Sequence, residues 1–209
     1  MGIERRVFLA DLAVHALGLA LAAAGAVVLV QAAMRPAAHG LLWPVIVYLA
    51  GLAAMLGCSA LYSTWRSSRH REWLRRLDHA AIFCMIAGTY TPLVQPLPAP
   101  WAAGLTAGVW TAAGAGVAAK LWQPRRIEAL SVALYLVLGW IGVVAAKPLL
   151  ATLDGTVLAL MLAGGVVYSA GVVFHLSSRW RYGRALWHGA VLVGAMLHYI
   201  AILVLLDVR

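Results

Sequence analysis

Residues 41–64 read LLWPVIVYLAGLAAMLGCSALYST, a run without a charged side chain. An α-helix needs about 20 apolar residues to cross roughly 30 Å of hydrocarbon, so this run is long enough to span a membrane. A basic cluster, RSSRHR at residues 66–71, follows it after Trp65. Long apolar runs alternate with short basic clusters along the rest of the chain, and this pattern predicts a polytopic, all-α membrane protein.

The composition of the whole chain agrees with this pattern. Of its 209 residues, 64% are hydrophobic and 11% are charged, whereas about a quarter of the residues of a soluble domain are charged. A formal net charge of +9 would suggest a nucleic-acid partner for a soluble protein, but here the basic residues lie between apolar runs. We therefore expect membrane lipids as partners, no nucleic acid, and one integral membrane domain over residues 1–209.

Seven apolar runs are bounded by charged residues, proline or glycine. The sequence predicts a seven-transmembrane-helix bundle with spans at about residues 11–33, 41–64, 79–96, 100–121, 128–147, 153–175 and 185–206. Pro92 interrupts the third run, where we expect a kinked span. Gly104 and Gly108 have the GxxxG spacing of a helix contact.

The basic residues are unevenly divided between the two ends of these spans. The side that holds the N-terminus has 13 of the 16 Lys and Arg residues, namely Arg5, Arg6, Arg66, Arg69, Arg71, Arg75, Arg76, Lys120, Arg125, Arg126, Arg179, Arg181 and Arg184. The other side has Arg35, Lys147 and Arg209. The positive-inside rule therefore predicts a cytoplasmic N-terminus and a C-terminus outside. As an alternative, Arg5 and Arg6 could belong to a cleaved twin-arginine export signal, which would leave six spans.

Few ionisable side chains lie inside the predicted spans, and their cost in hydrocarbon makes them functional candidates. Several occur four residues apart and so share a helix face. Because successive spans alternate in direction, most of these groups lie near the cytoplasmic ends, and we expect a cytoplasm-facing polar cavity. Its expected residues are Asp11, His15, Ser59, Ser63, Asp78, His79, Arg184, His188 and His198. Each could instead act locally, with Asp78 as a helix cap and Arg184 reaching water.

Residues 77–92, LDHAAIFCMIAGTYTP, closely resemble the signature of the hemolysin III family, the bacterial branch of the progestin and adipoQ receptor superfamily. The stretch ADLAVHALG from Ala10 is similar to a family pattern that has Asn where Asp11 stands. GVVYSAGVVF from Gly165 and WHGAVLVGAMLHY from Trp187 follow in the family's order. The resemblance implies seven helices, an N-terminus inside, and a multi-pass location in the bacterial cell (inner) membrane. The family name records a lytic activity, but no residue pattern here indicates a pore.

The resemblance also implies a zinc site. Members of the superfamily resemble zinc-dependent lipid amide hydrolases, whose metal is held by one His ending span 2 and two His opening span 7, with an Asp of span 3 nearby. Here Ser63 and Arg184 occupy two of the three His positions, whereas His188 and Asp78 are retained. His188 and Asp78 are thus the candidate metal ligands and also the candidate catalytic residues.

Two functions follow from these residues. The first is a hemolysin III-like protein without zinc catalysis or another cofactor, which binds a lipid or forms an ion pathway, with Arg184 replacing the metal and pairing with Asp78 or Asp11. The alternative is a zinc-dependent, ceramidase-like lipid amide hydrolase, with Asp78 assisting proton transfer. A rearranged zinc site of His15, His79 and His188 stays open.

Two other classes with membrane helices need residues that can be checked directly. A retinal protein needs a Schiff-base lysine within the membrane, but Lys120 and Lys147 both lie at predicted span ends. A haem carrier needs two axial histidines at matching depth, for which His15 and His188 could serve.

Overall fold

The computed structural model describes residues 2–65, 69–122, 128–177 and 179–208. Four of the basic residues that were counted for the membrane orientation lie outside these ranges, namely Arg66, Arg125, Arg126 and Arg209. The described residues form helices and connecting turns without a strand. The helices are α1 (Ile3–Ala33), η1 (Pro36–Ala38), α2 (Leu42–Thr64), α3 (Arg71–Leu93), α4 (Ala99–Trp122), α5 (Glu128–Trp140), η2 (Ile141–Ala145), α6 (Ala146–Thr152), α7 (Gly155–Leu176) and α8 (Gly183–Asp207), where η marks a 3₁₀ helix.

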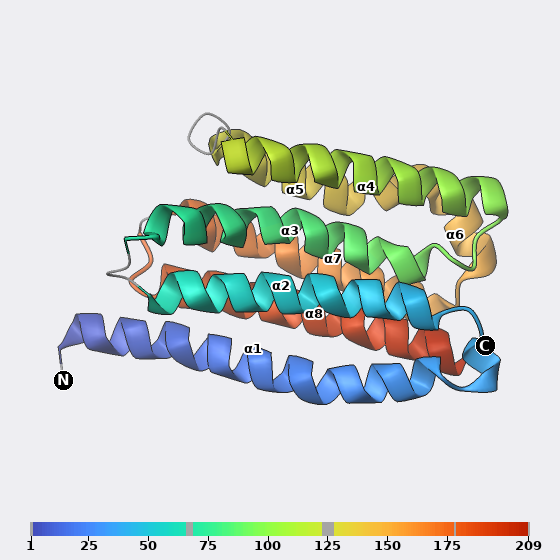
Figure 1. The fold of residues 1–209 in the computed structure, drawn as a ribbon, viewed down its shortest axis with the longest axis horizontal. Helices are drawn as coiled ribbons and strands as arrows, with labels where there is room; N and C mark the ends of the chain where they lie inside the picture. The colour runs from blue at the N-terminus through green and yellow to red at the C-terminus, as the bar shows by residue number, and fades with distance from the viewer. Residues whose placement is uncertain (1, 66–68, 123–127, 178, 209) are drawn as a thin grey trace.

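The long helices run side by side along one axis of the molecule (Figure 1). α1 to α4 follow one another across the bundle, and α8, α7 and α5 form a second layer behind them. The last helix, α8, packs against the first helix, α1, as well as against α7. The N-terminus and the C-terminus lie at opposite ends of the bundle (Figure 1).

Six segments of the described chain are long and apolar enough to cross a membrane. One of them, Leu130–Thr152, passes through α5, η2 and α6. The chain is therefore an all-α membrane protein, as the apolar runs predict. α3 is not among the six, although its 23 residues equal α2 in length. Its first two turns contain Arg71, Glu72, Arg75 and Arg76, which lower its mean hydropathy.

The charged first turns of α3 contact its neighbours, which explains why this helix begins eight residues before the predicted span. Arg76 donates a hydrogen bond of 2.8 Å to the carbonyl of Leu121, in the last turn of α4. A guanidinium there compensates one of the carbonyls that a helix end leaves without a partner. The Arg71 guanidinium lies 4.7 Å from the ring centre of Tyr62 on α2. These contacts extend α3 beyond its apolar part.

Pro92 lies next to the last residue of α3. α3 thus continues through Pro92 and ends one residue later, whereas the predicted span continues to residue 96.

The fifth predicted span, residues 128–147, contains an interruption that the sequence pattern does not indicate. α5 passes into the 3₁₀ helix η2 and then into α6. Backbone groups freed inside a membrane need a partner from the protein. The hydroxyl of Tyr90, on α3, donates to the Gly139 carbonyl at 2.7 Å and accepts from the Gly142 N–H at 2.9 Å.

Close helix packing uses other glycines than the predicted pair. A Cβ at Gly104 or Gly108 would meet no neighbouring atom within 4 Å, so these residues do not form a tight contact. A Cβ at Gly51 of α2 would lie 3.0 Å from the carbonyl oxygen of Cys84 on α3, and one at Gly88 would lie 3.2 Å from the carbonyl oxygen of Val47. Glycine at these positions lets the backbones of α2 and α3 approach each other closely.

The loop before α7 has a helix cap. The carboxylate of Asp154 accepts a hydrogen bond of 2.7 Å from the backbone N–H of Thr156. This bond holds the pKa of the Asp154 carboxyl below its usual value, because it stabilises the charged form.

Candidate functional site

A cavity of about 500 Å³ lies between helices α1, α2, α3, α5, α7 and α8. Ligand pockets in proteins typically have volumes of about 300–1,000 Å³. Two cavity residues, Arg184 and His198, are 14 positions apart on α8, which corresponds to about 21 Å along a helix. The cavity is thus elongated along the helix axes.

The lining of this cavity changes in character along its length. Polar side chains line the part near the bundle end that holds the N-terminus, and they are His15, Ser59, Ser63, Asp78, His79, Arg184 and His188. Aromatic and aliphatic side chains line the more central part, including Met85, Ile86, Tyr90, Leu136, Trp140, Tyr168 and Val172. This central part also has the polar side chains of Thr89, Ser169 and His198. Nε2 of His198 donates to the Met161 carbonyl at 3.1 Å. The cavity is therefore polar at one end and mainly apolar further in.

The structure brings eight of the nine sequence-predicted cavity residues to the wall of this cavity. Asp11 is not among the lining residues, and instead it contacts His188. Asp78 lies well inside α3, whose capping residue is His70, so the alternative role of Asp78 as a helix cap is not realised. Half-buried Asp78 lies within electrostatic range of His188, Arg184 and Asp11.

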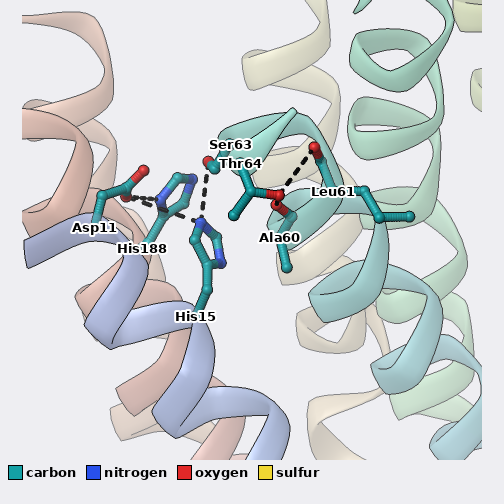
Figure 2. A network of polar contacts seen from close by, with 7 residues as sticks. All are labelled: Asp11, His15, Ala60, Leu61, Ser63, Thr64 and His188. Atoms are coloured by element: carbon teal, nitrogen blue, oxygen red, sulfur yellow. Dashed lines mark hydrogen bonds and ion pairs between the residues drawn. The ribbon is translucent and has the colours of Figure 1, made fainter. Parts of the chain in front are cut away.

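Asp11, His15, Ser63 and His188 form a polar cluster in which α1, α2 and α8 meet (Figure 2). Nδ1 of His188 donates to Oδ1 of Asp11 at 2.5 Å. Nε2 of His15 lies 3.8 Å from the same carboxylate oxygen and 3.1 Å from Oγ of Ser63. The two imidazole rings have their centres 4.4 Å apart. The cluster is thus continuous from Asp11 to the cavity wall.

The cluster is buried although α1 is largely exposed on the outside of the bundle. Only six of the 31 residues of α1 are buried, and Asp11 and His15 are two of them. They are 3% and 4% exposed, respectively. Buried ionisable groups are stable only when they are paired or bound to a metal. Their i and i+4 spacing directs both side chains toward α2 and α8.

Three members of this cluster could hold a metal ion. Asp11, His15 and His188 each offer one ligand atom, and these atoms lie within 4.8 Å of one another. Two imidazoles and one carboxylate are the donor set of several catalytic zinc sites. Ser63 and Arg184, which occupy the family's ligand positions, do not fit a cation in the same way, because a hydroxyl is a weak ligand and a guanidinium repels the metal. Asp78, a predicted ligand, is not part of this group.

The expected ion pair of Arg184 is not formed. Within the part of the chain that the structure describes, no contact of 4.0 Å or less joins Arg184 to Asp78 or to Asp11, and Arg184 is exposed. Arg184 is the second residue of α8, so its long side chain can reach water while its stem lines the cavity mouth. The nearest basic partner of Asp11 is instead His188.

The alternative zinc site of His15, His79 and His188 differs from the observed group of ligand atoms in one residue. His15 and His188 come together, but His79 lies outside the group of ligand atoms and Asp11 takes the third position. His79 lines the cavity from α3, and its backbone carbonyl accepts a hydrogen bond of 2.8 Å from Tyr135.

Two side chains with polar tips deeper in the bundle, Tyr90 and Trp140, were not among the sequence-predicted site residues. Tyr90 lines the cavity and holds the interruption after α5. Trp140 also lines the cavity, and its Nε1 donates a hydrogen bond of 3.0 Å to Oγ of Ser169 on α7. Their residue type could have identified them in the sequence, because a tyrosine or tryptophan inside an apolar run has a polar tip that needs a hydrogen-bond partner.

Comparison with known proteins agrees with the signature in α3. The family described as haemolysin-III related matches residues 10–199. The hemolysin-3 homolog of Bacillus subtilis (strain 168) is 32% identical over 199 residues, covering 93% of this chain and 92% of the relative. Hemolysin-3 of Bacillus cereus is 38% identical over 148 residues, or 68% of each chain. The heptahelical transmembrane protein ADIPOR2 of Oryza sativa subsp. japonica is 32% identical over 192 residues, or 80% of this chain and 83% of the relative.

The family match spans nearly all of the helical bundle and includes the polar cluster on α1, α2 and α8. With six apolar segments in the described part of the chain, the protein is a multi-pass integral membrane protein, and its bacterial relatives fit a location in the bacterial inner membrane. The protein belongs to the haemolysin-III related family, within a superfamily that also includes the heptahelical relative.

Proposed function

We propose that this protein binds a membrane lipid in the cavity between α1, α2, α3, α5, α7 and α8. The observation that carries the proposal is the amphipathic lining, which is polar near one bundle end and aromatic or aliphatic further in. A fatty acyl chain suits the central part, and a headgroup with hydrogen-bonding groups suits the end lined by Ser63, Asp78 and His188.

The lipid site belongs to a single seven-span domain with a cytoplasmic N-terminus. α3 supports the seventh crossing, because it is as long as α2 and packs against both α2 and α4. Termini at opposite ends of the bundle agree with an odd number of crossings. The excess of basic residues beside the N-terminus supports this orientation. The polar end of the cavity then faces the cytoplasm.

A pair of neighbouring residues on α5 provides the test. Leu136 is half-buried and lines the cavity, whereas Val137 is 67% exposed on the outer surface of the bundle. Native mass spectrometry of protein released from mild detergent would measure the retained lipid. We expect Leu136→Trp to reduce the bound fraction by about tenfold, equivalent to about 1.4 kcal/mol, and Val137→Trp to leave it unchanged. Equal retention by both variants, or no retained lipid in the unaltered protein, would contradict the proposal.

A zinc-dependent lipid amide hydrolase is the second candidate function. It is favoured by one observation, the donor set of Asp11, His15 and His188 beside a lipid-sized cavity. A bound zinc ion would supply a Lewis acid that activates water and polarises an amide carbonyl. The chain's own contribution would be to hold the ion with these three residues and to offer the Asp78 carboxylate, on the cavity wall, for proton transfer.

Incubation of the purified protein with labelled ceramide-like amides, with and without a chelator, separates the two candidates. Turnover that the chelator abolishes would favour the hydrolase. Lipid retention without turnover would favour binding alone.

A further inference from the structure

We infer that Asp11, His15 and His188 form a zinc site that joins α1 to α8, with two of its three ligands on the first helix. The inference does not depend on the proposed lipid, because it concerns the metal and these three side chains. It differs from the ligand positions that the family resemblance implies, since neither position 63 nor position 184 supplies a ligand.

The distances between the ligand atoms suit a small ion after minor side-chain movement. Tetrahedral zinc with bonds of about 2.0 Å places its ligand atoms about 3.3 Å apart. Oδ1 of Asp11 lies 2.5 Å from Nδ1 of His188 and 3.8 Å from Nε2 of His15. No pair in the group exceeds 4.8 Å. One of these two distances is shorter and the other longer than the separation that tetrahedral zinc requires. Rotations of the three side chains can therefore bring the ligand atoms to that separation.

The chemistry of the donors selects the class of metal. Imidazole nitrogen binds first-row transition ions such as zinc more strongly than it binds magnesium or calcium, which prefer oxygen ligands. Three protein ligands leave a fourth position of a tetrahedral ion open. His15 and His188 also line the cavity, so this position can be reached from the cavity.

The contact between His15 and Ser63 explains how α1 can supply ligands. Nε2 of His15 lies 3.1 Å from Oγ of Ser63, and both residues are almost completely buried. The imidazole of His15 therefore fills the space next to position 63 into which a longer side chain on α2 would extend. A histidine at position 63 and His15 are alternative ways to bring one imidazole to the same place.

Burial gives an independent reason to expect a positive partner for Asp11. Asp11 is 3% exposed, and no arginine or lysine among the described residues forms an ion pair with it. Its contacts are two histidines, which carry a positive charge only when protonated. A divalent cation would compensate this carboxylate without requiring protonation of either ring.

The first experiment exchanges the ligand between the two helices. Protein with a purification tag free of histidine is dialysed against zinc and then against buffer, and its zinc content is measured by plasma mass spectrometry. We expect about one zinc ion per chain, and a loss of about tenfold or more in Asp11→Asn and His15→Ser. The double variant His15→Ser, Ser63→His should regain zinc, because it returns an imidazole to the same place from α2.

Two histidine variants serve as matched controls. His79 lines the cavity outside the ligand group, and His39 is exposed after η1. His79→Ala and His39→Ala should keep the zinc content of the unaltered protein. Zinc that is retained in Asp11→Asn and His15→Ser, or absent from the unaltered protein, would overturn the inference.

A second measurement needs no substitution and so does not depend on the folding of variants. Zinc X-ray absorption of the unaltered protein should show two imidazole ligands at about 2.0 Å together with oxygen. A coordination shell with no imidazole, or with three, would also overturn the inference. Lipid retention in Leu136→Trp is measured separately from zinc content. One result can therefore contradict the proposed lipid site without contradicting the zinc site, and the reverse.

Discussion

The helices α1 and α8 are joined near both ends by an acidic and a basic side chain, and the two pairs differ mainly in their surroundings. At one end Asp11 contacts His188, and their side chains are 4% and 14% exposed. At the other end Arg35 contacts Asp207, and their side chains are 60% and 52% exposed. The closest distance is 2.5 Å in both pairs.

Equal distances in these two pairs do not mean equal importance. Water and salt screen an exposed ion pair, whose contribution to stability is usually between 0 and about 1 kcal/mol. Removal of one partner from a buried pair leaves a polar or charged group without compensation and costs about 3–5 kcal/mol. The buried pair also adjoins the cavity, through His188, whereas the exposed pair does not. The buried pair thus lies in the candidate site, whereas the exposed pair joins two helix ends away from the cavity.

The largest expected effect is the loss of the buried carboxylate. Asp11→Ala, measured in the presence of a chelator so that no metal contributes, should lower the free energy of unfolding by about 3 kcal/mol, because His188 loses its buried acceptor. Unfolding in mixed micelles with increasing dodecyl sulfate would measure the change. The matched control is Asp207→Ala, at the exposed end of the same two helices. A smaller effect for Asp11→Ala than for Asp207→Ala would refute the distinction between the two ends.

An intermediate effect is expected at a buried contact without charge. Tyr90→Phe removes the hydroxyl that serves both the Gly139 carbonyl and the Gly142 N–H. The free energy of unfolding should fall by about 1–3 kcal/mol, since two backbone groups inside the bundle lose their partner. Tyr182→Phe, at an exposed residue, should change it by less than about 0.5 kcal/mol. This variant sharpens the comparison by separating the effect of burial from that of charge, and equal values for the two tyrosine variants would contradict it.

The smallest expected effect is at the exposed pair. Arg35→Ala should lower the free energy of unfolding by about 0.2–1 kcal/mol in dilute buffer. Raising the salt concentration to about 1 M should remove most of this difference, because the screening length then falls to about 3 Å. A double-mutant cycle with Asp207→Ala would isolate the pair itself. A coupling of several kcal/mol that persists at high salt would show that exposure does not weaken this pair.

Much of the fold could be predicted because hydrocarbon imposes simple rules on a sequence. Apolar length locates α2 at residues 42–64, within one residue of the predicted start. The apolar run at residues 79–96 also predicts α3, but not its charged first turns, so the predicted span begins eight residues after the helix does. The interruption after Trp140 could not be predicted, because it depends on a hydroxyl from Tyr90, 49 positions before Gly139 in the chain.

The candidate site was predictable as a set of residues but not as a set of contacts. The i and i+4 spacing puts Asp11 and His15 on one face of α1 whatever the tertiary structure is. Their encounter with His188 depends on the packing of the first helix against the last, which no local pattern encodes. Arg184 was expected to pair with Asp78 because opposite charges at one membrane depth attract, but a side chain at the start of α8 can reach water instead.

The contact between Asp11 and His188 joins residues that are 177 positions apart. Ribosomes add about 5–20 residues per second, so Asp11 enters the growing chain about 10–35 s before its imidazole partner is made. Throughout that interval the nascent first helix has only His15 beside this carboxylate and lacks the closer contact with His188. Translation products that stop before α8 keep this defect, which gives membrane quality control a physical difference between truncated and complete chains.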